Sequence, residues 1–189
     1  MVIYLRGEDT YRVDEALRAY VGAYQRKHDP KGVSVARLDG ETLDVQDLQR
    51  AVATPGLLTS RQLVVLRRLA SRKKVDAADT LAALLSDHRI PAEVVLIVVE
   101  HGVPESAKRT PAVFAVLAAL PPRRPKARDE DFQERFDALV GRALEQWVDE
   151  AARRRGTRLA PAARALLLGL TSGDLRRVAS VPNIVLLKW

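Results

Sequence analysis

The feature that most constrains the fold is an uninterrupted apolar run at positions 94–99. Its sequence is Val-Val-Leu-Ile-Val-Val, and the structure breakers Pro91 and Gly102 flank it. A strand that is apolar on both faces must be covered on both faces, as in the middle of a parallel sheet. The run is also far too short to cross a lipid bilayer. The sequence therefore predicts a buried central strand and no membrane span.

Strand-like and helix-like segments alternate before this run. Apolar, strand-like segments lie at 2–5, 33–38 and 62–66, and apolar residues at helical spacing follow each of them, at 11–24, 43–52 and 77–85. Regular alternation of this kind gives a parallel sheet with helices on both faces. We expect an α/β domain of the nucleotide-binding type over residues 1–121.

A basic, proline-rich segment then interrupts the alternation. Prolines without an amide donor and repelling like charges favour an extended path, so we predict a linker at 122–130. Beyond it, residues 131–155 show helical spacing, a second helix begins near Pro161, and Asp174 is placed to cap a third. We therefore predict a small, all-helical second domain over residues 131–189.

Composition narrows the functional classes. Lys and Arg number 31 against 24 Asp and Glu, and the formal charge of +7 favours an anionic partner. The absence of cysteine excludes disulfides, thiolate metal sites and a cysteine nucleophile. Aromatic residues, at 5%, are too few for a platform that stacks single-stranded bases. Charges at positions 6, 8 and 9 interrupt the stretch that is apolar in a signal peptide, so we expect a cytoplasmic protein.

The turn after the first strand lacks the chemistry of a phosphate-binding loop. Such a loop is rich in glycine and carries a lysine that reaches the terminal phosphates. Here the turn contains Gly7, Glu8 and Asp9, and the two carboxylates would repel a phosphate. We interpret the two acidic residues as caps of the following helix. The sequence therefore predicts a degenerate nucleotide site with no cofactor.

Other catalytic patterns are weaker. The histidines His28, His88 and His101 have no second histidine at i+4, so we expect no metal site. Arg67-Arg68 follows the third strand and would repel a magnesium ion there. Glu100 and His101 end the central strand, at an edge where open parallel sheets place active-site residues, and they remain catalytic candidates.

Four motifs follow one another along the chain. They are Tyr-Leu-Arg-Gly-Glu-Asp at 4–9, Leu-Asp-Gly-Glu at 38–41, Thr-Pro-Gly-Leu-Leu-Thr-Ser-Arg-Gln-Leu-Val-Val-Leu at 54–66 and Leu-Thr-Ser-Gly-Asp-Leu-Arg at 170–176. In this order and spacing they resemble the delta subunit of the bacterial DNA polymerase III clamp loader, over residues 1 to about 178. The resemblance implies an AAA+ (RecA-like) parallel sheet, a helical lid domain and a collar domain that joins subunits into a ring. It also implies a non-catalytic subunit that binds and opens the sliding clamp, the beta subunit, without its own ATP hydrolysis.

The resemblance places clamp binding at Leu57 and Leu58, where the family has a Leu-Phe pair. Both residues follow a Pro-Gly turn and precede the polar segment 59–61, as expected of exposed side chains. Burial of two leucines in a partner's pocket contributes about 3–6 kcal/mol before association costs. The alternative is that they pack under the edge of their own sheet.

Basic residues cluster after this pair. They are candidates for electrostatic contact with the acidic clamp surface or with primer-template DNA, and the alternative is a solvated face: Arg61, Arg67, Arg68, Arg72, Lys73 and Lys74. The same two interpretations apply to Arg123, Arg124, Lys126 and Arg128.

The resemblance ends after Val178. Pro182 would break the helix that the family continues, and we expect the segment 182–189 to pack poorly or to pair with another chain. We expect the collar domain to be absent, and other clamp-loader subunits would be partners only if a collar were present. Primer-template DNA is expected to be an indirect partner. A second functional class stays open: a basic DNA-binding accessory protein on a degenerate AAA+ scaffold.

Overall fold

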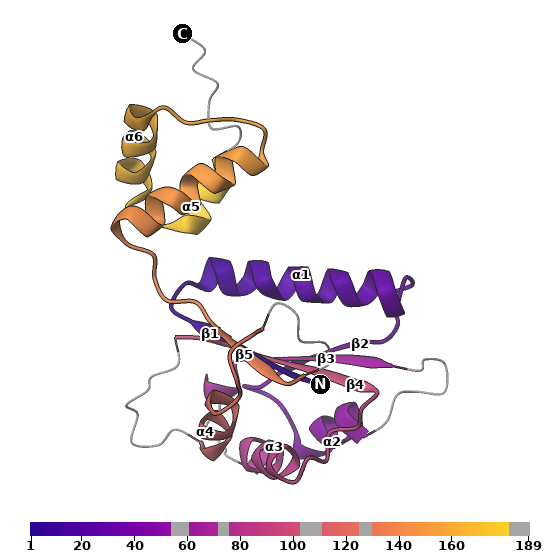
Figure 1. Cartoon of the computed structure of the whole chain (residues 1–189). Coiled ribbons are helices and arrows are strands. Elements are labelled where there is room, and N and C mark those ends of the chain that lie inside the picture. The colour runs from indigo at the N-terminus through magenta and orange to yellow at the C-terminus, as the bar shows by residue number, and fades with distance from the viewer. Residues whose placement is uncertain (54–60, 72–75, 103–110, 125–129, 182–189) are drawn as a thin grey trace. The chain divides into compact units, whose positions relative to one another are not determined.

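Five parallel strands form a sheet in the order β2-β3-β4-β1-β5. In the computed structural model, which describes residues 1–53, 61–71, 76–102, 111–124 and 130–181, the strands are β1 (Val2–Gly7), β2 (Val35–Asp39), β3 (Gln62–Arg67), β4 (Val94–His101) and β5 (Phe132–Arg135) (Figure 1). The sheet belongs to the first of two compact units, Met1–Phe136, and the second unit is Asp137–Trp189. The predicted parallel α/β architecture is confirmed.

β4 is the buried central strand that the sequence predicts. It lies between β3 and β1, and all residues from Val94 to Glu100 are buried. Its β-branched side chains alternate between two apolar layers, one on each face of the sheet, which is why the strand is apolar throughout.

The two faces of the sheet are covered unequally. On one face lie α2 (Val45–Ala53), the short 3₁₀ helix η1 (Leu69–Ser71), α3 (Asp76–Ser86) and α4 (Ala112–Ala118). In the described part of the chain, the opposite face is covered by α1 (Thr10–His28) alone (Figure 1). Val13, Leu17 and Tyr24 point from this helix into the core, as their helical spacing predicts.

The prediction of a helix from residue 131 is wrong over its first ten residues. Phe132–Arg135 forms β5 and pairs with β1, and α5 begins only at Gly141. Tertiary contacts override the helical spacing, because the side-chain amide of Gln133 donates to the carbonyls of Ala118 (2.6 Å) and Leu120 (2.8 Å). The basic segment is drawn to this edge as well, since the amide of Arg123 donates to the carbonyl of Gln133 (3.2 Å).

In its described residues, the second unit contains three short helices, α5 (Gly141–Arg154), α6 (Pro161–Thr171) and α7 (Leu175–Ser180), around a small core of Val148, Leu167 and Val178. Pro161 is the first residue of α6, as predicted, because an N-terminal helical residue needs no amide donor. The predicted cap Asp174 accepts hydrogen bonds from the amides of Arg176 (2.8 Å) and Arg177 (3.0 Å).

The prediction for residues 182–189 lies outside the described residues. Within the described ones, no helix is long and apolar enough to span a bilayer.

Candidate functional site

In the turn between β1 and α1, the side chain of Asp9 binds the N-terminus of the helix that follows. Asp9 is the N-cap of α1, and its carboxylate accepts a hydrogen bond from the amide of Arg12 (3.0 Å). The exposed Glu8 adds a second negative charge at the same place. The interpretation of Asp9 as a cap is confirmed. Because a helix N-terminus binds anions through its free amides, this carboxylate takes the position that a phosphate would need.

The backbone of Phe136 closes the turn from outside. Its carbonyl accepts from the amide of Asp9 (3.1 Å), and its amide donates to the carbonyl of Arg6 (2.8 Å). Gly7 has φ +147°, and a Cβ placed there would lie 2.6 Å from the carbonyl carbon of Phe136. Only glycine allows so close an approach. The space above the turn is therefore filled by protein backbone.

The carboxyl ends of β3 and β4 present two basic side chains to one carboxylate. Asp14 of α1 lies 2.7 Å from Nη2 of Arg67 and 3.4 Å from Nε2 of His101. Asp14 is thus already engaged by Arg67 and His101 at the edge where a magnesium carboxylate would be needed. No cluster of three or more His, Asp or Glu suited to a metal ion occurs among the described residues.

The structure separates the catalytic candidates Glu100 and His101. Successive strand residues point to opposite faces, so only His101 reaches Asp14. Glu100 is buried on the other face, where it accepts a hydrogen bond from the amide of Ala70 in η1 (3.1 Å). Burial raises the pKa of Glu100 to about 7, and hydrogen bonds from the amides of Ala70 and Leu69 oppose this shift. Its visible role is to hold η1 against the end of β4.

The two arginines at the carboxyl end of β3 are engaged by carboxylates of their own chain. Arg67 pairs with Asp14, and Arg68 donates to Asp39 and lies 3.3 Å from Glu41. The hydrogen bond from Arg68 holds the pKa of Asp39 below its ordinary value. These carboxylates offset part of the positive charge of both guanidiniums, whose side chains remain 41% and 56% exposed.

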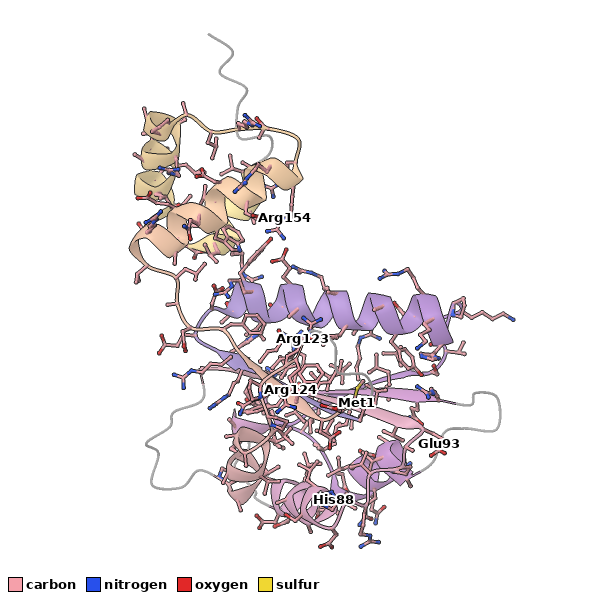
Figure 2. All side chains as sticks on the ribbon, in the orientation of Figure 1. Met1, His88, Glu93, Arg123, Arg124 and Arg154 are labelled. Atoms are coloured by element: carbon pink, nitrogen blue, oxygen red, sulfur yellow. The ribbon has the colours of Figure 1, made fainter. Side chains whose placement is uncertain are left out.

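The remaining basic candidates are divided between described and undescribed residues. Arg123 lies 3.4 Å from Glu134 and 5.6 Å from the ring centre of Tyr20, and Arg124 is exposed beside it (Figure 2). Arg61 is partly exposed next to β3. Outside the described residues lie Leu57, Leu58, Arg72, Lys73, Lys74, Lys126 and Arg128.

Sequence reasoning missed the parts played by Phe136 and Asp14. Both act across large separations in the chain, and no local pattern announces such a pairing. A cation–π contact joins the two segments, since the guanidinium of Arg12 lies 5.3 Å from the ring centre of Phe136. The sequence alone does not identify Phe136 as the aromatic partner of Arg12.

Comparison with known structures identifies the class of fold. The chain is similar in structure to the *Bacillus subtilis* DNA clamp loader delta protein, with a TM-score of 0.59, 15% identity and coverage of 94% of this chain and 50% of that one. It is also similar to the *Thermotoga maritima* RuvB Holliday junction branch migration motor, with a TM-score of 0.53, 13% identity and coverage of 94% and 51%. The fold is thus of the AAA+ (RecA-like) class, with a parallel sheet and a helical second unit.

The chain spans about half the length of these two structures. No protein-family model matches the sequence, and no curated protein matches it.

The filled turn predicts that the chain does not bind nucleotide there. We expect MgATP to leave the melting temperature unchanged, because the carboxylate of Asp9 already accepts from an amide at the N-terminus of α1 and the backbone of Phe136 covers the turn. Thermal unfolding with increasing MgATP, against magnesium chloride alone, tests this. A rise that grows with nucleotide concentration would show binding and contradict the interpretation.

Proposed function

We propose that this chain acts as a clamp-loader subunit of the delta type, which binds and opens the sliding clamp during DNA replication without hydrolysing ATP. The observation that carries the proposal is the AAA+ type sheet whose phosphate position is closed by Asp9 and Phe136. The four ordered sequence motifs and the likeness in fold to a clamp loader delta protein support it.

Leu57 and Leu58 are the proposed contact with the clamp. They fall between the end of α2 at Ala53 and the start of β3 at Gln62. An apolar pair of this size is enough to anchor an interface, although it does not make a whole one.

The proposed mechanism needs no covalent step. A clamp ring that exists as a closed majority and an open minority is shifted toward the open form by any protein that binds the open form more tightly. In this mechanism the subunit binds the open clamp more tightly than the closed clamp. Companion subunits bind and hydrolyse ATP and so control when the clamp is opened.

Replacement of both leucines tests the proposal. We expect the double substitution Leu57→Ser and Leu58→Ser to weaken binding to the sliding clamp of the same organism at least about a hundredfold, because the apolar anchor is lost. Leu166→Ser is the matched control, since this leucine of α6 is 62% exposed in the second unit. Isothermal titration of the clamp gives the affinities. Equal affinity of the double variant and the parent chain would contradict the proposal.

The formal charge of +7 favours the alternative of a DNA-binding accessory protein. Gel filtration with the clamp and titration with duplex DNA at several salt concentrations separate the two functions. If the chain forms no complex with the clamp and binds duplex DNA with a steep dependence on salt, the alternative is correct.

A further inference from the structure

A pocket opens between α1 and the sheet, at the amino ends of β1, β3 and β4. Its volume is about 180 Å³. It exists because α1 alone covers this face in the described part of the chain, and one helix is too narrow to cover the apolar side chains of neighbouring strands (Figure 1). Met1, which also lines the pocket, marks this end of the sheet in Figure 2.

The floor of the pocket is apolar, and its walls include two tyrosine rings and the imidazole of His28. Ile3, Leu63 and Ile97 form the floor, and their side chains belong to the core layer beneath α1. The hydroxyls of the two wall tyrosines are already in hydrogen bonds, Tyr24 with Oγ of Ser34 (3.1 Å) and Tyr20 with Glu134. An occupant of the pocket would therefore meet mainly hydrocarbon and ring surfaces, and the other polar groups of the lining belong to Lys27, His28 and Arg61.

Two basic residues that are at least partly exposed to solvent line the pocket, and we call their side of it the mouth. Lys27 and Arg61 both line it, from α1 and from the residue that precedes β3, and neither forms an ion pair with another described residue. Among the residues that the structure describes, no carboxylate lines the pocket. Glu134, which touches the wall through Tyr20, is also 3.4 Å from Arg123. The charge at the mouth thus complements an acidic occupant.

We propose that this pocket is a docking site for one large apolar side chain, phenylalanine or leucine, carried on an acidic segment of a partner protein. A cavity of about 150 Å³ accommodates a benzene ring, whereas pockets for nucleotides or drug-sized ligands are about 300 Å³ or larger. The size fits a single side chain, the lining fits its apolar surface, and Lys27 and Arg61 fit carboxylates beside it. This proposal does not depend on clamp binding by Leu57 and Leu58.

The lining favours a protein side chain over a nucleobase. A base carries several donors and acceptors, which a pocket with its hydroxyls already paired would leave unsatisfied. Basic residues at the mouth suit phosphates as well as carboxylates, so an oligonucleotide is the competing occupant that the experiment must distinguish.

The test uses the full chain and a synthetic acidic pentapeptide with phenylalanine at its centre. Titration followed by NMR of the backbone amides should show saturable shifts at the lining residues. Ala23→Glu should weaken binding at least about tenfold, because it places a negative charge at the wall and next to Lys27, one turn along the helix. Lys27→Glu should act in the same direction.

Ala19→Glu is the matched control, since Ala19 is an exposed residue of the same helix that does not line the pocket. We expect it to change the affinity less than about twofold. A peptide with alanine in place of the central phenylalanine should bind at least about tenfold more weakly than the parent peptide. Thermal melts of each variant establish that it is folded.

Three outcomes would overturn the proposal. Equal effects of Ala23→Glu and Ala19→Glu would indicate attraction by net charge alone. Equal binding of the alanine peptide would show that no side chain enters the pocket. Displacement of the peptide by a single-stranded oligothymidylate, with stronger shifts at the same amides, would assign the pocket to a nucleic acid. A Leu57→Ser variant should retain peptide binding, which separates this result from the test of clamp binding.

Discussion

Gly7→Ala should lower the free energy of unfolding by about 3 kcal/mol or more. At φ +147° an alanine is strained, which costs about 1–3 kcal/mol. Its Cβ would lie 2.6 Å from the carbonyl carbon and 2.8 Å from the amide nitrogen of Phe136, and these backbone atoms cannot rotate away as a side chain can. Relief of the clash requires the two hydrogen bonds of Phe136, to Asp9 and Arg6, to break, at about 1 kcal/mol each.

Gly102→Ala is a matched control for this substitution. Gly102 has φ +64°, lies at the end of β4, and donates its amide to the carbonyl of Gly7 (2.9 Å). No described atom lies within 4 Å of a Cβ placed there, so only the backbone strain of about 1–2 kcal/mol remains. Urea unfolding of both variants at one pH gives the two values. Equal losses would contradict the close packing of Phe136 over the turn.

The elements that could be predicted from sequence are those with strong local signals. The apolar run that forms β4 can be recognised without knowledge of the strands beside it, because a strand with apolar residues on both faces must be buried on both faces. Asp9 and Asp174 are recognisable for the same reason, since an N-cap satisfies amides two or three residues away in the chain.

β5 and α4 show where local signals fail. Phe132 and Phe136 fit the helical spacing of the residues after them, but Phe132–Arg135 pairs with a strand some 130 positions earlier. α4 has only seven residues, all of them apolar, so it has no polar face to reveal a helical period. Both elements are fixed by the sheet onto which they pack.

The residue types of the candidate site could be predicted from the sequence, but the contacts between distant segments that close it could not. The lack of a phosphate-binding lysine follows from the sequence, whereas the closure by Phe136 depends on the course of a distant segment. The grouping of Glu100 with His101 overlooked strand alternation, which places adjacent residues on opposite faces. Clamp binding by Leu57 and Leu58 stays a prediction.

The second large effect is expected from Glu100 as the pH changes. Its pKa is about 7 in the folded chain because of burial, against an ordinary value of 4.5. Below about pH 4.5 both folded and unfolded chains hold the proton, and the shift has no effect on stability. As the pH rises, the unfolded chain releases its proton first, so the folded state becomes relatively less stable. The loss reaches about 3 kcal/mol above pH 7.

Glu100→Gln should remove this loss. Glutamine keeps the shape of the side chain and an oxygen that can accept from the amide of Ala70, but it does not ionise. The variant should therefore gain stability relative to the parent chain by about 3 kcal/mol between about pH 4 and pH 8, whatever the constant cost of the amide group. Urea unfolding at several pH values measures the difference.

The exposed Glu93, which precedes β4 and is labelled in Figure 2, provides the control. Glu93→Gln removes the same charge from the chain without altering the contact between β4 and η1. If both glutamine variants changed equally with pH, the effect would arise from net charge rather than from burial of Glu100. The hydrogen bond from the amide of Ala70 offsets only part of the rise that burial causes in the pKa of Glu100. If Glu100→Gln left the dependence of stability on pH unaltered, water would reach this carboxylate, and η1 would not seal the end of β4.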